Sequence, residues 1–156
     1  MQVPENILVK FPALLRNKLK NNDIVFCDNV QFDYEDIEAY RIIKRTTKDN
    51  TPVTIADFQS NAELGRTKIK GVDGDVTKIP EYYGVSFYKD KTQLQLRCSL
   101  PPKKCKIAKG YIYCAGGPIL ENTTTSHVCW WLYENVDVSN FTIETKQNES
   151  EKEVLI

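Results

Sequence analysis

The sequence predicts a single α+β domain in which N-terminal helices precede a mostly antiparallel, curved sheet. Helical leucine spacing is confined to the early part of the chain, and the later part holds strand-length runs of β-branched and aromatic residues separated by turn residues. The 156 residues suffice to bury one core without cross-links. We expect the domain to span residues 1–145 and a polar, frayed tail to span 146–156.

The first helix is expected over residues 11–20, where leucines recur at helical spacing and Pro12 suits the first turn. A short buried strand is expected over residues 24–27, because four apolar residues stand there between polar turns. Residues 39–45 combine β-branched and aromatic side chains before a polar turn, which predicts a longer strand.

A second helix is expected over residues 54–64, with Gly65 as its natural end. Two capping boxes, Thr-x-x-Asp from position 54 and Ser-x-x-Glu from position 60, compete to start it. Residues 66–79 are polar and glycine-containing, which indicates a connecting loop. Asp90 is expected to cap a short third helix.

The last part of the chain is expected to be mainly strands and turns. The most informative strand contains the only histidine and both tryptophans of the chain. Period-two alternation places His127, Cys129, Trp131 and Tyr133 on one face and Val128, Trp130, Leu132 and Glu134 on the other. This pattern predicts a core strand that brings a functional edge to a cleft. The expected strands cover residues 82–88, 106–114, 119–120, 126–134 and 141–143.

Composition argues against several classes of function. Basic and acidic residues number 21 each, so there is no global basic field to favour nucleic acid. No apolar run approaches the roughly 18 residues that indicate a membrane span. The first residues lack the layout of a signal peptide, so we expect a cytoplasmic protein without a membrane partner. A local basic patch keeps nucleic acid as a third possibility: Arg97, Lys103, Lys104, Lys106 and Lys109.

The five cysteines are odd in number and contain no C-x-x-C pair, and a lone histidine does not favour zinc. We therefore expect no metal site and interpret the thiols as small buried hydrophobes. His127 and Cys129 lie two positions apart on one strand face, about 7 Å, which is too far for a direct nucleophile–base hydrogen bond. A cysteine on a neighbouring strand, such as Cys114, is an open alternative, as is a half-buried histidine bonded to the backbone.

Three polar residues on three expected strands suggest a catalytic site. Arg41, Ser86 and Glu134 occur in that order with comparable spacing. This order resembles the arginine–serine–glutamate class of ADP-ribosyltransferases, although Val85 and Leu132 depart from the motifs usual there. The resemblance implies that the arginine holds the phosphates of NAD, the serine braces the site, and the glutamate stabilises an oxocarbenium-like transition state.

Further residues are candidates for the same site. Tyr83 or Tyr88 would stack on nicotinamide, and Lys109 would bind a phosphate or carboxylate unless it extends to solvent at a sheet edge. His127 completes the candidate catalytic set. NAD is therefore the expected cofactor if the transferase reading holds.

Residues 80–135 resemble segments of small uncharacterised proteins of bacteria and their phages, as in the run 126–133. That resemblance implies a cytosolic bacterial or phage origin. Because no catalytic motif is complete, our leading interpretation is an interaction or conflict protein that acts by binding a partner protein. The expected interface is a set of aromatic side chains, since tyrosine and tryptophan often anchor interfaces: Tyr82, Tyr83, Phe87, Tyr88, Tyr111, Tyr113, Trp130 and Trp131.

Overall fold

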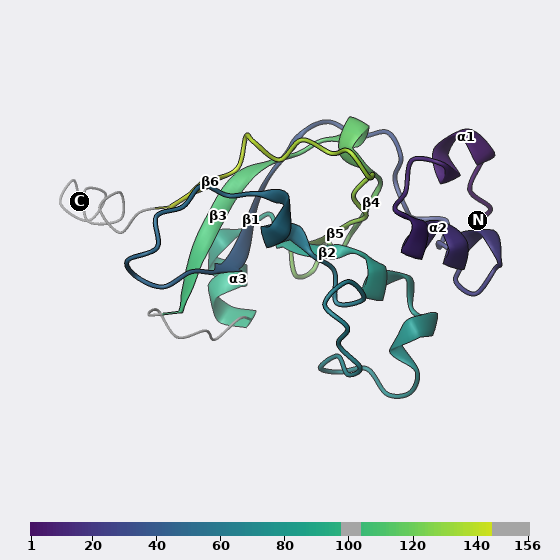
Figure 1. The fold of residues 1–156 in the computed structure, drawn as a ribbon, viewed down its shortest axis with the longest axis horizontal. Coiled ribbons are helices and arrows are strands. Elements are labelled where there is room, and N and C mark those ends of the chain that lie inside the picture. The colour runs from purple at the N-terminus through teal and green to yellow at the C-terminus, as the bar shows by residue number, and fades with distance from the viewer. Residues whose placement is uncertain (98–103, 145–156) are drawn as a thin grey trace.

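A computed structural model describes residues 1–97 and 104–144. In that part of the chain an open, six-stranded antiparallel sheet has the order β4-β5-β2-β1-β3-β6 (Figure 1). Together with the helices, it confirms the expected α+β class. The strands are β1 (Ile37–Lys44), β2 (Val85–Tyr88), β3 (Cys105–Ile112), β4 (Ile119–Glu121), β5 (His127–Trp130) and β6 (Thr142–Ile143).

The helices of the described residues lie at two places around the sheet (Figure 1). The N-terminal pair lies near the end of the sheet formed by β4, and α3 contacts β1 and β2. The α-helices are α1 (Glu5–Leu8), α2 (Ala13–Lys20) and α3 (Lys91–Arg97), and the 3-10 turns are η1 (Ile55–Phe58), η2 (Val76–Lys78), η3 (Pro80–Tyr83) and η4 (Cys114–Gly116).

The ladders of the sheet are unequal in length. β1 pairs with β3 along its whole length, and β2 pairs with β5 along its whole length. The ladder between β1 and β2, in contrast, contains one pair, Tyr40 opposite Tyr88. The two strands therefore diverge beyond this pair, in the middle of the sheet.

One face of the sheet buries the larger of two hydrophobic clusters, which we call the sheet cluster. Its aromatic rings interlock, with the rings of Phe58 and Phe87 stacked at a centroid distance of 5.7 Å. Such contacts between rings add to the stabilisation from burial alone. The cluster comprises Ala39, Ile43, Val53, Phe58, Val85, Phe87, Ala108, Ile112, Ile119, Val128, Trp130, Val138 and Phe141.

The second cluster, the N-terminal cluster, joins the two N-terminal helices to the end of the sheet. The rings of Phe26 and Trp131 lie 4.6 Å apart at its centre. Consecutive residues of the chain thus enter different cores, because Trp130 belongs to the sheet cluster and Trp131 to this one. Its members are Leu8, Phe11, Leu15, Leu19, Ile24, Phe26, Val30, Val76, Tyr82, Tyr83, Cys129 and Trp131.

The expected second helix over residues 54–64 is wrong, and its two capping boxes explain why. Thr54 and Asp57 form a box that starts the short η1 turn. Ser60 and Glu63 form the other, in which each side chain accepts a hydrogen bond from the backbone N–H of its partner. Each box begins its own turn, and Gln59 between them is extended, so one continuous helix does not form.

Other expected boundaries also change. Residues 24–27 form no strand; Ile24 and Phe26 are buried, while Val25 is 53% exposed. The expected strand over 126–134 is shorter, since β5 ends at Trp130. Its alternation is nevertheless correct, although the face with Cys129 and Trp131 is a second core and not an open functional edge. The expected frayed tail lies outside the described residues.

The expectation of buried thiols is largely wrong. Cys129 is buried, whereas Cys27 is exposed and both Cys105 and Cys114 are partly exposed. Burial raises the pKa of the Cys129 thiol well above its usual range. Cys98 lies outside the described residues.

Candidate functional site

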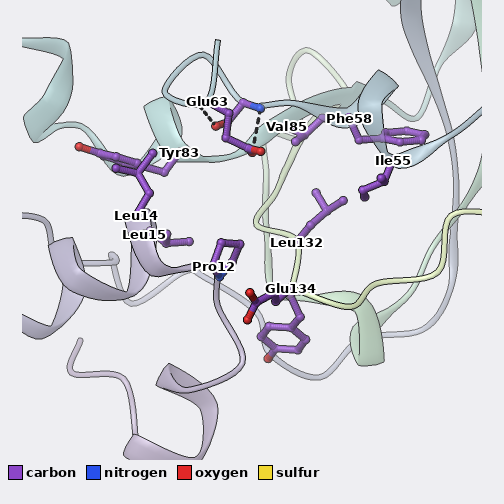
Figure 2. A pocket seen from close by; sticks show the side chains of 12 residues that line it. Pro12, Leu14, Leu15, Ile55, Phe58, Glu63, Tyr83, Val85, Leu132 and Glu134 are labelled. Carbon is purple, nitrogen blue, oxygen red and sulfur yellow. Dashed lines mark hydrogen bonds between the residues drawn. The ribbon is translucent and has the colours of Figure 1, made fainter. Parts of the chain in front are cut away.

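A pocket of about 130 Å³ lies between helix α2 and the sheet, and we call it the α2 pocket (Figure 2). It is well below the roughly 300–1,000 Å³ of sites for small molecules, so it has the size of a socket for a side chain. It lies between the two hydrophobic clusters, because members of both line it. Its lining residues are Pro12, Leu14, Leu15, Ile55, Phe58, Ser60, Glu63, Tyr83, Val85, Leu132, Tyr133 and Glu134.

The α2 pocket combines an apolar wall with two carboxylates. Leu14 and Ile55 are 46% and 51% exposed, so part of the apolar lining is open to solvent. Glu63 and Glu134 lie on opposite sides of the pocket, with Leu132 and Pro12 between them (Figure 2). This arrangement suits a group that is apolar at one end and cationic at the other.

The local sequence explains how these residues are placed. Leu15 and Leu19 are four positions apart on the buried face of α2, which turns Leu14 away from the N-terminal cluster. Glu63 is held by its capping box with Ser60. Beyond β5, Trp131 and Tyr133 donate backbone hydrogen bonds to the carbonyls of Pro118 and Gly116, and the backbone N–H of Glu134 donates to the carbonyl of Lys10 at 2.8 Å.

A second and larger opening, the inter-strand cavity, lies where β1 and β2 diverge and has a volume of about 440 Å³. Residues from both faces of the sheet line it, from which we infer that it opens between the two strands. It falls within the usual size range of small-molecule sites, roughly 300–1,000 Å³. Among its lining residues are Arg41, Ile42, Lys44, Asp57, Asn61, Arg66, Ser86, Tyr88 and Leu94.

The guanidinium of Arg41 spans this opening. Its Nε donates to the carbonyl of Asp57, and its Nη1 donates to the carbonyl of Ser86, each at 3.0 Å. The neighbouring Arg45 binds the Asp57 carboxylate through two hydrogen bonds of 2.6 and 2.7 Å. This bidentate contact raises the pKa of Arg45 and neutralises the carboxylate.

A third group of polar side chains forms a cross-strand row on the sheet face opposite the sheet cluster. Lys109 lies opposite Tyr40, Tyr40 opposite Tyr88, and Tyr88 opposite His127. The Nζ of Lys109 is 5.8 Å from the centroid of the Tyr40 ring, and the rings of Tyr88 and His127 meet edge to face at 5.2 Å. Burial lowers the pKa of His127, which favours its neutral ring. Lys109 also lies 3.7 Å from a carboxylate oxygen of Glu38.

The structure distributes the seven residues expected to form a site over these three places. The inter-strand cavity is lined by Arg41, Ser86 and Tyr88, the cross-strand row contains His127, Tyr88 and Lys109, and the α2 pocket is lined by Tyr83 and Glu134. In the cross-strand row the rings of Tyr40 and Tyr88 lie between Lys109 and His127. The sequence did not indicate this arrangement.

The expectation that Arg41, Ser86 and Glu134 share one hollow is not met. The Arg41 side chain lies on the same face of β1 as Ala39 and Ile43 of the sheet cluster, while the Ser86 side chain points to the other face. The two nevertheless line the same cavity, because it opens through the sheet. Glu134 lies beyond the end of β5 and lines the α2 pocket instead.

The expected aromatic interface is also wrong for the described structure. Of its eight members only Tyr111 is largely exposed, at 48%, and the other seven are buried or partly buried. Most of the others fill the two clusters or bond inward, as Tyr83 does by donating its hydroxyl to the carbonyl of Thr77 at 2.7 Å.

Sequence reasoning missed Leu14, Ile55 and Glu63 of the α2 pocket, and Lys44 and Arg66 of the inter-strand cavity. One signal was present for Leu14: a third leucine beside a pair at i and i+4 falls off their common helix face. No signal in the sequence indicated the others: Ile55 and Glu63 reach the α2 pocket through tertiary packing, and Lys44 and Arg66 meet because β1 and β2 separate.

Within residues 1–97 and 104–144, no three or more His, Cys, Asp or Glu side chains are grouped so that they could hold a metal ion. None of the described helices is long and apolar enough to cross a membrane. Comparison with known proteins found no matching family model, no matching curated protein and no matching solved structure.

Proposed function

We propose that this chain is a cytosolic interaction protein that binds a partner protein through the α2 pocket. The proposed occupant is a partner segment that presents an apolar side chain beside a lysine or arginine. One observation carries the proposal: an apolar socket of side-chain size stands between two carboxylates, Glu63 and Glu134. A bacterial or phage origin is part of this proposal.

The apolar part of the pocket supplies the driving force. Full burial of a leucine or isoleucine side chain stabilises by about 1.5–3 kcal/mol. Leu14 and Ile55 are about half exposed, so a partner that covers both would gain roughly half of that amount from each. Leu14 stands on α2 and Ile55 on η1, and each of these short elements packs through buried side chains, Leu15 and Leu19 in α2 and Phe58 in η1.

The carboxylates supply selectivity. Glu63 and Glu134 are exposed at the rim, where charge contributes to the rate of encounter and to the choice of partner more than to affinity. An acidic partner would be repelled by both. A cationic group next to the inserted apolar side chain would find a carboxylate on either side.

The direct experiment is selection of peptides from a random library displayed on phage, with the full chain as bait. The proposal predicts a consensus with one large apolar residue flanked by lysine or arginine. Leu14→Asp and Ile55→Asp should each abolish binding of the selected peptides. Leu96→Asp is the matched control, because Leu96 is 74% exposed on α3 and does not line the pocket. An acidic consensus would contradict the proposal. So would a loss of peptide binding in Leu96→Asp equal to that in Leu14→Asp and Ile55→Asp.

The alternative is an NAD-dependent ADP-ribosyltransferase-like activity. Its support is that Arg41 and Ser86 line a common cavity large enough for a small ligand. It is the weaker candidate because Glu134, the carboxylate it requires, lines the α2 pocket. Titration of the full chain with NAD separates the two: the alternative requires saturable binding that Arg41→Lys weakens, and no binding at millimolar NAD rejects it.

A further inference from the structure

We propose that the inter-strand cavity is a second binding site, which takes a small polyanion such as an oligophosphate or a polycarboxylate. The site is separate from the proposed partner-binding pocket and does not depend on that function. Three features of the cavity carry the inference: the direction of its backbone N–H groups, the charge of its lining and its size.

The first feature is the direction of the backbone on the β1 side. In an antiparallel ladder, the N–H and C=O groups of successive residues point alternately to the two neighbouring strands. The N–H of Arg45 donates to the carbonyl of Lys104, at 3.0 Å, on the β3 side. The backbone N–H and C=O groups at odd positions of β1 therefore point toward β3. Those of Ile42 point toward β2 and the cavity.

The same reasoning applies to β2. The N–H of Lys89 donates to the carbonyl of Ser126, at 2.9 Å, on the β5 side, so the backbone of Ser86 faces β1. The carbonyl of Ser86 accepts from Arg41, in agreement with this direction. Ile42 and Ser86 would be the next ladder pair after Tyr40 and Tyr88, but the ladder ends before them. Their N–H donors are thus directed at the opening.

The second feature is charge. Among the described lining residues, Arg41, Lys44 and Arg66 are cationic, and Asp57 is the acidic one. Asp57 is already neutralised by its two short hydrogen bonds from Arg45. The cavity therefore presents an excess of positive charge together with hydrogen-bond donors, although the chain as a whole is neutral. Guanidinium groups bind carboxylates and phosphates particularly well.

The third feature is size and position. With about 440 Å³, the cavity accepts a ligand with several anionic groups, whereas one bound ion would leave most of it empty. Arg41 lies inside the opening, held by the carbonyls of Asp57 and Ser86. Lys44 and Arg66 are more exposed and stand nearer the solvent. A polyanion can therefore contact Arg41 with one group and the two outer cations with others.

Isothermal titration calorimetry of the full chain tests this site, with tripolyphosphate as the oligophosphate probe and citrate as the polycarboxylate probe. We expect saturable one-to-one binding of at least one probe, weakened by added salt. The probe that binds more tightly identifies the anion class. Arg66→Gln should weaken binding roughly tenfold and Lys44→Gln by a smaller factor. Both side chains are exposed, so neither change should disturb the fold.

Lys20→Gln is the matched control, because it removes an exposed cation on α2 that does not line the cavity. The proposal is overturned if neither probe binds at millimolar concentration, or if binding is unchanged by Arg66→Gln and Lys44→Gln together. Its failure is distinguishable from failure of the partner-binding proposal, since Leu14→Asp should leave anion binding intact and Arg66→Gln should leave peptide binding intact.

Discussion

The sheet cluster and the N-terminal cluster are built differently, although one strand supplies side chains to both. Strands joined by backbone ladders provide most of the sheet cluster. The N-terminal cluster depends on helices of four and eight residues, which are too short to be stable alone. As a result, β5 has no solvent-facing side at its centre: Val128 and Trp130 enter one core, while Cys129, and Trp131 directly after the strand, enter the other.

Backbone connections between the two regions are few in the described residues. They include the isolated pair of Gln31 with Ile119 and the hydrogen bond from the Glu134 N–H to the Lys10 carbonyl. Side-chain packing around Trp131 does most of the joining. We therefore expect the N-terminal region to open locally more readily than the sheet. The α2 pocket lies on the boundary between a rigid part and a more mobile one.

The largest expected effects come from the two tryptophans. Each change to alanine should lower the free energy of unfolding by about 3–5 kcal/mol. Trp130→Ala should raise hydrogen exchange throughout the sheet, because Trp130 is fully buried and its indole N–H donates to the Gly117 carbonyl. Trp131→Ala should raise exchange mainly in α1 and α2. Uniform exchange in both variants would show that the two clusters are one cooperative unit.

The next effect concerns the point where the two clusters meet. Gly117 has φ of +142°, and a Cβ there would lie 1.9 Å from the Trp131 carbonyl oxygen. Gly117→Ala should lower the free energy of unfolding by about 3 kcal/mol. Gly65→Ala is the control: Gly65 also has positive φ, +68°, but open space around it, so its expected loss is about 1 kcal/mol. Equal losses in chemical denaturation would remove the steric explanation.

A smaller effect is the dependence of stability on pH. Burial lowers the pKa of His127, the only histidine, so the unfolded chain binds its proton more readily than the folded one. The contribution of the neutral ring is complete above the unfolded pKa, about 6.5, and is lost as the pH falls from there through the folded value. His127→Gln should flatten this part of the profile. An unchanged profile in urea titrations would assign it to other groups.

The smallest perturbation uses the cysteines as reporters. Iodoacetamide should modify exposed Cys27 quickly and buried Cys129 slowly, since burial raises the pKa of the Cys129 thiol. Cys129 belongs to the N-terminal cluster, so its modification should follow local opening of that cluster and be faster than global unfolding. Peptide mapping by mass spectrometry measures both rates. Modification of Cys129 at the rate of global unfolding would contradict local opening.

The sequence predicted local features better than long-range ones. Alternation along residues 126–134 assigned the correct faces, and the leucine spacing located α2, because both patterns follow from the geometry of one element. The same alternation could not show that a second core covers the face of Cys129 and Trp131. That cover comes from α1, α2 and residues 24–30, about 100 or more residues earlier in the chain, and from residues 76–83.

The candidate site shows the same limit. Arg41 and Ser86 line one cavity although their side chains lie on opposite faces of the sheet, because the cavity opens through the sheet. Glu134 was placed wrongly because a period-two pattern does not say where a strand ends: β5 ends at Trp130, and the Glu134 N–H bonds to the carbonyl of Lys10. The aromatic residues, similarly, have no property in sequence that separates core from interface.

Hydrogen exchange of the full chain, with and without a peptide selected on it, tests the proposed docking at the α2 pocket most directly. We expect slower exchange in α2 and in residues 55–63 and 132–134, with exchange in β3 unchanged. Protection centred on β3 and β6, or none in α2 at saturating peptide, would contradict it.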